Sequence, residues 1–161
     1  MRKETRWLGW GLYGLACLVL SWQFILWIQA PVLKNDLGQS VSTVIPYHKW
    51  RLVSYWSDWC NACEEELEAL NTLEQTWPQI EILSVHIDLP PIAVLQQFVT
   101  HYHLKFRLLQ QDPKPFFKLP SFTSIPANFV IDPKGKVYGP YIGKIEPSTL
   151  AQLINSEVAQ P

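Results

Sequence analysis

Two cysteines separated by two residues are the part of this sequence best suited to covalent chemistry. Cys60 and Cys63 stand in the stretch YWSDWCNACEEELEAL, residues 55–70, after several aromatic residues and before four glutamates. A pair of thiols at this spacing has three common uses: a structural disulfide, half of a metal site, or a redox centre. The residues around the pair favour the third use.

A structural disulfide or a metal site explains this pair less well. A disulfide that closes so short a loop stabilises the folded protein by only about 2 kcal/mol, through the lost entropy of the unfolded chain, against ~3 kcal/mol for a loop of ~15 residues. A structural zinc site needs four ligands. Apart from the three cysteines, the sequence offers as soft ligands only four separate histidines, His48, His86, His101 and His103. We interpret these histidines as exposed or satisfied side chains and expect no metal.

A redox centre explains where the pair lies. The run RLVSYW, residues 51–56, is typical of a buried strand, and the apolar residues after Cys60 recur every three or four positions, as in an amphipathic helix. A thiol at a helix start meets unpaired N–H groups and the positive end of the helix dipole, which can lower its pKa from ~8.5 to ~3.5–7.5. We therefore expect Cys60 to attack as a thiolate and Cys63 to resolve the mixed disulfide.

The four glutamates are expected to divide between the two faces of this helix. Glu64, Glu65 and Glu68 fall on the outer face, where early carboxylates suit the helix dipole. Glu66 lies three residues after Cys63 and would point beneath the active site, where a partly desolvated carboxyl group could exchange a proton with Cys63. A simple surface glutamate is the alternative, and the two remain equally open.

Residues 1–30 are expected to form a separate segment. From Trp7 to Ile28 the chain has 22 residues without a charge, enough for a helix of about 33 Å that would cross a hydrocarbon core of ~30 Å. Three basic residues lie in the tail at 1–6, so the positive-inside rule places this tail in the cytoplasm and the rest outside. A cleaved signal peptide is the alternative, although the apolar run exceeds the usual ~7–15 residues.

The remaining chain alternates between strand-like and helix-like segments. Residues 29–50 indicate a tether and a short hairpin with its turn at 35–39, and residues 51–161 one further domain. Beyond 51–56 we expect strands at 81–88, 105–110, 127–132 and 136–143, helices at 90–103 and 147–158, and an ordered loop at 112–124. This order favours an α/β sandwich. The formal net charge of −1 does not suggest nucleic-acid binding.

On these features, residues 31 to about 158 resemble the thioredoxin superfamily, and more narrowly the membrane-anchored thiol–disulfide oxidoreductases of the TlpA/ResA/DsbE type. The shared features are the early hairpin, the aromatic run ending in Trp59 and Cys60, an inserted strand–helix segment around 80–110, and SIPANFVIDPKGKVYGPYIG. The resemblance implies a thioredoxin-like sandwich, in which helices flank a central mixed β-sheet, with an N-terminal hairpin and one preceding transmembrane helix.

The resemblance also implies a substrate groove beside the cysteines. Members of the family place a cis-proline opposite the CxxC motif, and Ile125-Pro126 matches that position, with an ordinary trans-proline as the alternative. The backbone of Ile125 would pair with a substrate polypeptide, Pro126 would keep metals off the thiols, and Trp59 would contribute to an apolar docking rim. The family's glutamate three residues after the second cysteine matches Glu66.

Three departures from the family pattern bear on the direction of electron flow. Ala62 stands where many relatives have proline, Glu68 where their helices often carry proline, and Ser54 where cytoplasmic thioredoxins bury an aspartate. Such residues tune the redox potential, so the direction of electron flow depends on them.

We therefore expect a thiol–disulfide oxidoreductase in the bacterial inner membrane, single-pass, with its catalytic domain in the periplasm and no cofactor. Its partners would be client proteins with disulfides or thiols, apocytochrome c among the candidates, a membrane electron donor or other redox partner, and lipid around the N-terminal helix. Reduction of clients is favoured by family analogy. The alternatives are an oxidase or isomerase on the same fold, and a thiol-based copper-binding module.

Overall fold

The computed structural model describes residues 17, 21, 32–44 and 49–158. The chain divides into two compact units, Met1–Val32 and Leu33–Pro161, and the second unit holds all the elements below. Among the described residues, no helix has the length and apolar character needed to cross a membrane. Nearly all of the membrane helix expected at 7–28 lies outside the described residues, so it stays a prediction.

In the described part of the chain, five strands form one mixed sheet in the order β3-β2-β1-β4-β5. The central strand β1 (Trp50–Trp56) pairs in parallel with β2 (Ile80–His86) and antiparallel with β4 (Ala127–Ile131). The edges are β3 (Arg107–Leu108) and β5 (Val137–Ile142). Every residue of β1 is buried, as expected for a central strand covered on both faces.

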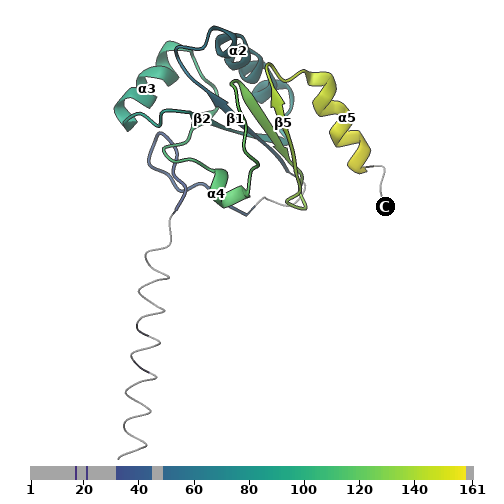
Figure 1. Cartoon of the computed structure of the whole chain (residues 1–161), viewed down its shortest axis with the longest axis horizontal. Helices are drawn as coiled ribbons and strands as arrows, with labels where there is room; N and C mark the ends of the chain where they lie inside the picture. Colours follow the sequence, from purple (N-terminus) through teal and green to yellow (C-terminus); the bar gives the residue numbers. More distant parts are fainter. Residues whose placement is uncertain (1–16, 18–20, 22–31, 45–48, 159–161) are drawn as a thin grey trace, which may run out of the picture. The chain divides into compact units, whose positions relative to one another are not determined.

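The longer helices follow the strands in the predicted order (Figure 1). α2 (Asn61–Thr76) starts directly after the first cysteine, α3 (Ile92–His101) connects β2 to β3, and α5 (Pro147–Val158) follows β5. The α/β sandwich predicted from the order of segments is therefore present, with each of these helices near its predicted position.

The core has two parts, one on each face of the sheet. On one face, Leu52 and Trp56 of β1 pack in a cluster with buried residues of α2, α3 and α5. On the other face, Val53 and Tyr55 pack in a second cluster with Leu33 of the N-terminal hairpin and with residues of the segment between β3 and β4. This division follows from the strand geometry, because successive side chains point to opposite faces.

The hairpin predicted before the first strand is present, although it is very short. Lys34 and Ser40 form an antiparallel bridge, and Asn35 Oδ1 accepts hydrogen bonds of 3.0 Å from two backbone amides of the turn. A second bridge joins Asn35 to Leu109, just after β3. The hairpin is therefore tied to the sheet from its edge.

The loop predicted at 112–124 contains one turn of helix, α4 (Lys114–Phe117), so this prediction was wrong in part. Three prolines suggested an irregular segment, yet proline is tolerated in the first turn of a helix, where its missing N–H is not needed. Asp112 Oδ1 accepts hydrogen bonds from the Lys114 amide at 2.9 Å and from the Tyr55 hydroxyl at 2.6 Å. These bonds hold the turn against the sheet.

Candidate active site

Cys60 and Cys63 form a disulfide at the start of α2, with their Cα atoms 5.3 Å apart. Cys60 is the N-cap residue of the helix, and in the described structure no side-chain hydrogen bond caps this helix start. Cys63 is 0% exposed, whereas Cys60 is partly exposed. The outer sulfur can therefore meet another protein near uncapped N–H groups, while the inner sulfur is sheltered.

The loop before β4 lies against the outer cysteine. The Ile125–Pro126 peptide bond is cis, as the resemblance implied, and Ile125 O lies 3.9 Å from Cys60 Sγ. The next residue, Ala127, pairs with Tyr55 near the end of β1. This antiparallel pairing brings the loop to the end of β1 that the cysteines follow. Whether Ile125 and Pro126 bind a substrate stays a prediction.

The aromatic residues before the cysteines have different environments. Trp59 is 66% exposed, and its Nε1 donates a hydrogen bond to Asp88 Oδ2 at 3.1 Å. Trp56 is fully buried, with its ring edge-on to those of Phe98 and Tyr102. Of these two tryptophans, Trp59 is thus the one positioned to touch a partner.

Glu66 is completely buried one turn after Cys63, which corresponds to the inward alternative. Its Oε2 accepts a hydrogen bond from the Ile145 amide at 3.0 Å, and its Oε1 has no hydrogen-bond partner in the described structure. Burial raises the pKa of Glu66 to about 7, against the opposing effect of the Ile145 bond. A carboxyl group that titrates near neutrality can both accept and return a proton.

The other three glutamates are exposed, as the periodicity predicted. They are Glu64, Glu65 and Glu68. Ser54, which stands where cytoplasmic thioredoxins have an aspartate, is buried and its hydroxyl has no hydrogen-bond partner in the described structure. Glu66 is therefore the carboxyl group that the helix delivers to the interior of the site.

Comparison with known proteins agrees with this geometry. The model of the AhpC/TSA family matches residues 29–139. The chain belongs to the AhpC/TSA family. One curated relative is the thiol-disulfide oxidoreductase ResA of Bacillus cereus (strain ZK / E33L), which is 32% identical to this chain over 94 residues. The alignment covers 57% of this chain and 54% of that protein, so the chain spans about half the length of the curated relatives it matches.

Solved structures support the thioredoxin-like fold of this AhpC/TSA protein. A thiol:disulfide interchange protein of the thioredoxin family from Chlorobium tepidum TLS has a TM-score of 0.63 at 18% identity, covering 76% of this chain and 89% of that chain. StoA from Bacillus subtilis has a TM-score of 0.60 at 20% identity, covering 77% and 95%. At such identities the likeness shows the fold: a central mixed sheet with flanking helices.

The structure adds His86 to the site, a residue interpreted from the sequence as an ordinary histidine. His86 is the last residue of β2 and is 3% exposed. Its Nε2 lies 3.1 Å from Asp58 Oδ1, although the two residues are 28 positions apart in the chain. The parallel register, which puts His86 opposite Trp56, brings them together. The carboxyl ends of neighbouring parallel strands lie at the same end of a sheet. This rule could have indicated from the sequence that the residue ending the second strand lies near the cysteines.

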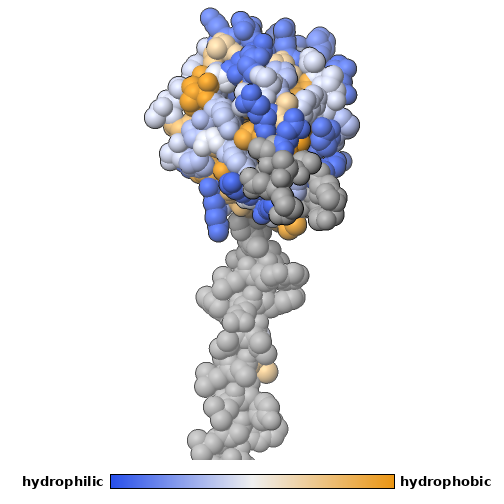
Figure 2. Space-filling view, turned by 90° about the vertical axis from the view of Figure 1, so that its right-hand side faces the viewer, coloured by the Kyte–Doolittle hydropathy of each residue, from blue (hydrophilic) through white to orange (hydrophobic). Residues whose placement is uncertain are grey.

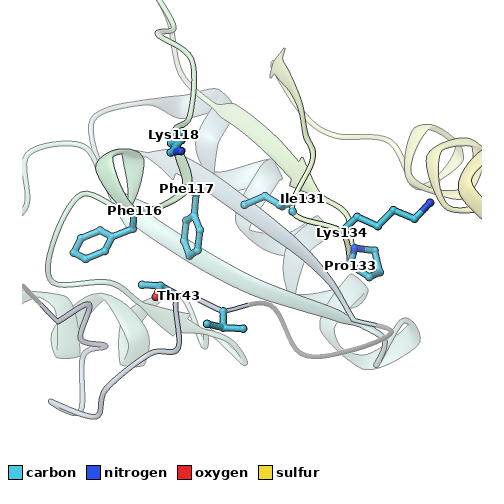
Figure 3. Close-up of a pocket in the computed structure, with 9 residues that line it drawn as sticks. Thr43, Phe116, Phe117, Lys118, Ile131, Pro133 and Lys134 are labelled. Atoms are coloured by element: carbon cyan, nitrogen blue, oxygen red, sulfur yellow. The ribbon is translucent and has the colours of Figure 1, made fainter.

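A cavity of about 380 Å³ lies elsewhere, against the second core cluster (Figure 3). Its lining includes Phe116, Phe117 and Ile131, together with Thr43 near the N-terminal hairpin. None of the residues around the disulfide lines it. We therefore assign this cavity no part in the chemistry of the cysteines.

Proposed function

We propose that this protein is a thiol–disulfide oxidoreductase that exchanges disulfides with other proteins through Cys60 and Cys63. The observation that carries the proposal is the disulfide at the helix start, with its outer sulfur partly exposed and 3.9 Å from Ile125 O. The similarity to ResA, a thiol-disulfide oxidoreductase, supports the same class of reaction.

In the reducing direction, the dithiol form of the protein gives two electrons to a client disulfide. The Cys60 thiolate attacks one client sulfur, forms a mixed disulfide and releases the other client sulfur as a thiolate. Cys63 then loses its proton and attacks Cys60 Sγ, which forms the internal disulfide and releases the second client thiol. A donor dithiol must afterwards return two electrons.

Glu66 is proposed as the group that takes the proton from Cys63 during the second attack. Its side chain lies in the interior one turn along the same helix, and burial raises its pKa to about 7. A base with this pKa removes a proton at neutral pH and returns it when the reaction runs backwards.

We further propose that the protein acts as a reductase at the outer face of the bacterial inner membrane, with 7–28 as its anchor. The uncharged stretch and the basic residues before it support the anchor and its orientation. Family analogy supports the reducing direction and apocytochrome c as one candidate client. A reduction potential nearer −270 mV than −120 mV would agree with a reductase, as judged from ~−270 mV for thioredoxin and ~−120 mV for DsbA.

Trapping tests the proposed reaction directly. In cells that produce a Cys63→Ala variant, mixed disulfides should accumulate on Cys60 because the resolving thiol is missing. These complexes are separated without reductant and the linked proteins are identified by mass spectrometry. The Cys60→Ala variant is the matched control and should capture far less. Equal capture by both variants would rule out Cys60 as the attacking residue.

A further inference from the structure

We infer that His86 is a positioning residue for Cys60: its imidazole holds the turn that leads into the attacking sulfur. The turn runs from Ser57 to Cys60, where the Cys60 amide donates to Ser57 O at 3.3 Å. The two middle residues of this turn are Asp58 and Trp59. His86 binds the first of them directly and the second through Asp88. The inference rests on the proposed role of Cys60.

The first arm joins the imidazole to Asp58. His86 Nε2 lies 3.1 Å from Asp58 Oδ1 and 3.4 Å from Ser57 Oγ. The side chain of Asp58 is 48% exposed, so without this partner it could rotate into solvent. The hydrogen bond from His86 lowers the pKa of Asp58, and the resulting carboxylate makes this a charge-assisted bond.

The second arm reaches Trp59 through Asp88. The Asp88 amide donates a hydrogen bond to His86 Nδ1 at 3.2 Å, and Asp88 Oδ2 accepts one from Trp59 Nε1 at 3.1 Å. Trp59 has little packing of its own, because it is 66% exposed. Asp88 therefore restrains a ring that stands next to the attacking cysteine.

One tautomer of the ring serves both arms. Because Nδ1 accepts the Asp88 amide, the ring proton is placed on Nε2, which donates it to the Asp58 carboxylate at 3.1 Å. The Asp58 amide also lies 3.3 Å from Nε2, and with the proton on Nε2 it does not donate to the ring. The tautomer is assigned from these partners. The titratable groups that face the two ring nitrogens are Asp58 and Asp88, at 3.1 and 4.0 Å.

The imidazole itself is firmly held. It stacks on Phe98 with ring centroids 5.2 Å apart and meets Trp56 edge-on at 5.0 Å. A side chain packed in this way can fix the position of the surface turn that it binds. The stabilisation of a thiolate by helix N–H groups falls off within the first turn of a helix. A displacement of the Ser57–Cys60 turn would therefore weaken the stabilisation of the Cys60 thiolate. His86 is thereby connected to the reactivity of Cys60 without touching a substrate.

The test measures how fast Cys60 reacts with iodoacetamide in the reduced, full-length protein carrying Cys17→Ala, with the site assigned by mass spectrometry. His86→Phe keeps an aromatic ring between Phe98 and Trp56 but loses both arms. We expect it to slow the reaction at pH 7 about ten-fold, since small displacements at an active site can change rates on this scale. His86→Gln, which keeps a donor near Nε2, should restore the rate to within about two-fold.

His101→Phe is the matched control, because His101 is exposed and its ring contacts Tyr102 rather than the turn. It should react at the parental rate. If His86→Phe also reacts at the parental rate, or if His86→Gln is as slow as His86→Phe in a folded protein, the inference is overturned.

A second pair of variants avoids the core. Asp88→Ala and Asp88→Asn both remove one negative charge, but only alanine removes the acceptor for Trp59 Nε1. A pure charge effect would make both variants react faster by the same factor, because a nearby anion disfavours a thiolate. We expect Asp88→Ala to react about three-fold more slowly than Asp88→Asn. Equal rates would overturn the inference even if His86→Phe does not fold.

The two proposals can fail separately. Reduction of insulin disulfides by the parental protein, with dithiothreitol as the electron source, tests the proposed function alone. If the parental protein reduces insulin and the variants show no loss of Cys60 reactivity, only the role of His86 is wrong. If the parental protein shows neither insulin reduction nor a reactive Cys60, the proposed function is wrong, and the inference that rests on it is overturned too.

Discussion

Single residues divide the chemistry at this site into an exposed and a sheltered part. Cys60 occupies the N-cap position of α2 and is partly exposed, whereas Cys63 and Glu66 are 0% exposed. This division suits a two-step exchange, because a partner can reach only the first sulfur while the second reacts within the protein. The same division makes the two thiols experimentally distinguishable.

In the reduced protein we therefore predict that Cys60 is alkylated at least about ten times faster than Cys63 at pH 7, because only Cys60 is both accessible and near uncapped N–H groups. Time-resolved peptide mass spectrometry after iodoacetamide treatment measures both rates. Unfolding in urea should make the two rates similar. Similar rates in the folded protein would contradict the assigned order of attack.

Burial of Glu66 predicts a pH dependence of stability. Its pKa is raised from 4.5 to about 7 in the folded protein, so folding favours the protonated form. The stability this contributes is fully present below pH 4.5 and is lost as the pH rises through about 7. Ionising the buried group costs about 3 kcal/mol. Glu66→Gln should escape this loss.

Urea unfolding of the parental protein and Glu66→Gln at pH 5 and pH 8 checks this prediction. The free energy of unfolding of the parental protein should fall relative to the variant by about 2–3 kcal/mol between the two pH values. Glu65→Gln, on the exposed face, is the control and should follow the parental protein. A constant difference between parent and Glu66→Gln would show that Glu66 does not titrate in this range.

At the scale of elements, the ends of three neighbouring strands bring the site residues together at one end of the sheet. β1 ends before Cys60, the parallel strand β2 ends at His86, and the antiparallel strand β4 begins after Pro126. Parallel neighbours bring their carboxyl ends together, and an antiparallel neighbour brings its start to the same place. The register of β1 thus governs which residues meet the disulfide.

The hairpin of β4 and β5 contains a position that only glycine fits. Gly139 has φ +115°, and a Cβ there would lie 2.7 Å from Asn128 O, beside the register shift between Asn128 and Val130. We predict that Gly139→Ala lowers the free energy of unfolding by about 3 kcal/mol, from backbone strain and steric overlap together.

Gly135→Ala is the matched control for this prediction. Gly135 also has a positive φ, +86°, but nothing lies within 4 Å of a Cβ at that position. Its substitution should cost only about 1 kcal/mol, the conformational part alone. Urea unfolding of both variants gives the comparison. Equal losses would mean that the contact with the Asn128 carbonyl relaxes at little cost.

At the scale of the whole molecule, the described residues of the unit Leu33–Pro161 separate an apolar interior from a more polar surface. The face shown in Figure 2 is largely hydrophilic, with small and separate hydrophobic areas. The buried apolar residues gather in the two clusters on either side of the sheet. The proposal of a membrane anchor rests on the composition of residues 7–28.

The membrane prediction is tested with the complete chain in a bacterial host. Alkaline phosphatase fused to the C-terminus should be active, because the positive-inside rule predicts that the unit Leu33–Pro161 is in the periplasm. The protein should stay with the membrane after a carbonate wash, and deletion of 7–28 should abolish both results. An inactive fusion, or release of the full chain by the wash, would contradict the proposed anchor.

The sequence by itself determined the features that depend on neighbours along the chain. The spacing of Cys60 and Cys63 is read directly from the chain, the order of strands and helices follows from local periodicity, and both are present in the structure. For Glu66 the sequence left an inward and a surface position open, and the structure has the inward one. The resemblance added the cis bond at Ile125–Pro126. The prediction from the sequence was wrong at α4, because three closely spaced prolines suggested a loop where one turn of helix forms.

Tertiary structure alone decided which distant residues meet. Ile145 reaches Glu66 across 79 positions and Asp58 reaches His86 across 28, whereas the meeting of Ile125 with Cys60 was already implied by the resemblance. The contact of Asp58 with His86 depends on the register of β1 and β2, since a shift of one residue would turn the His86 side chain to the opposite face. Periodicity indicates which face of an element is buried, but it carries no information about which residue of another element lies opposite.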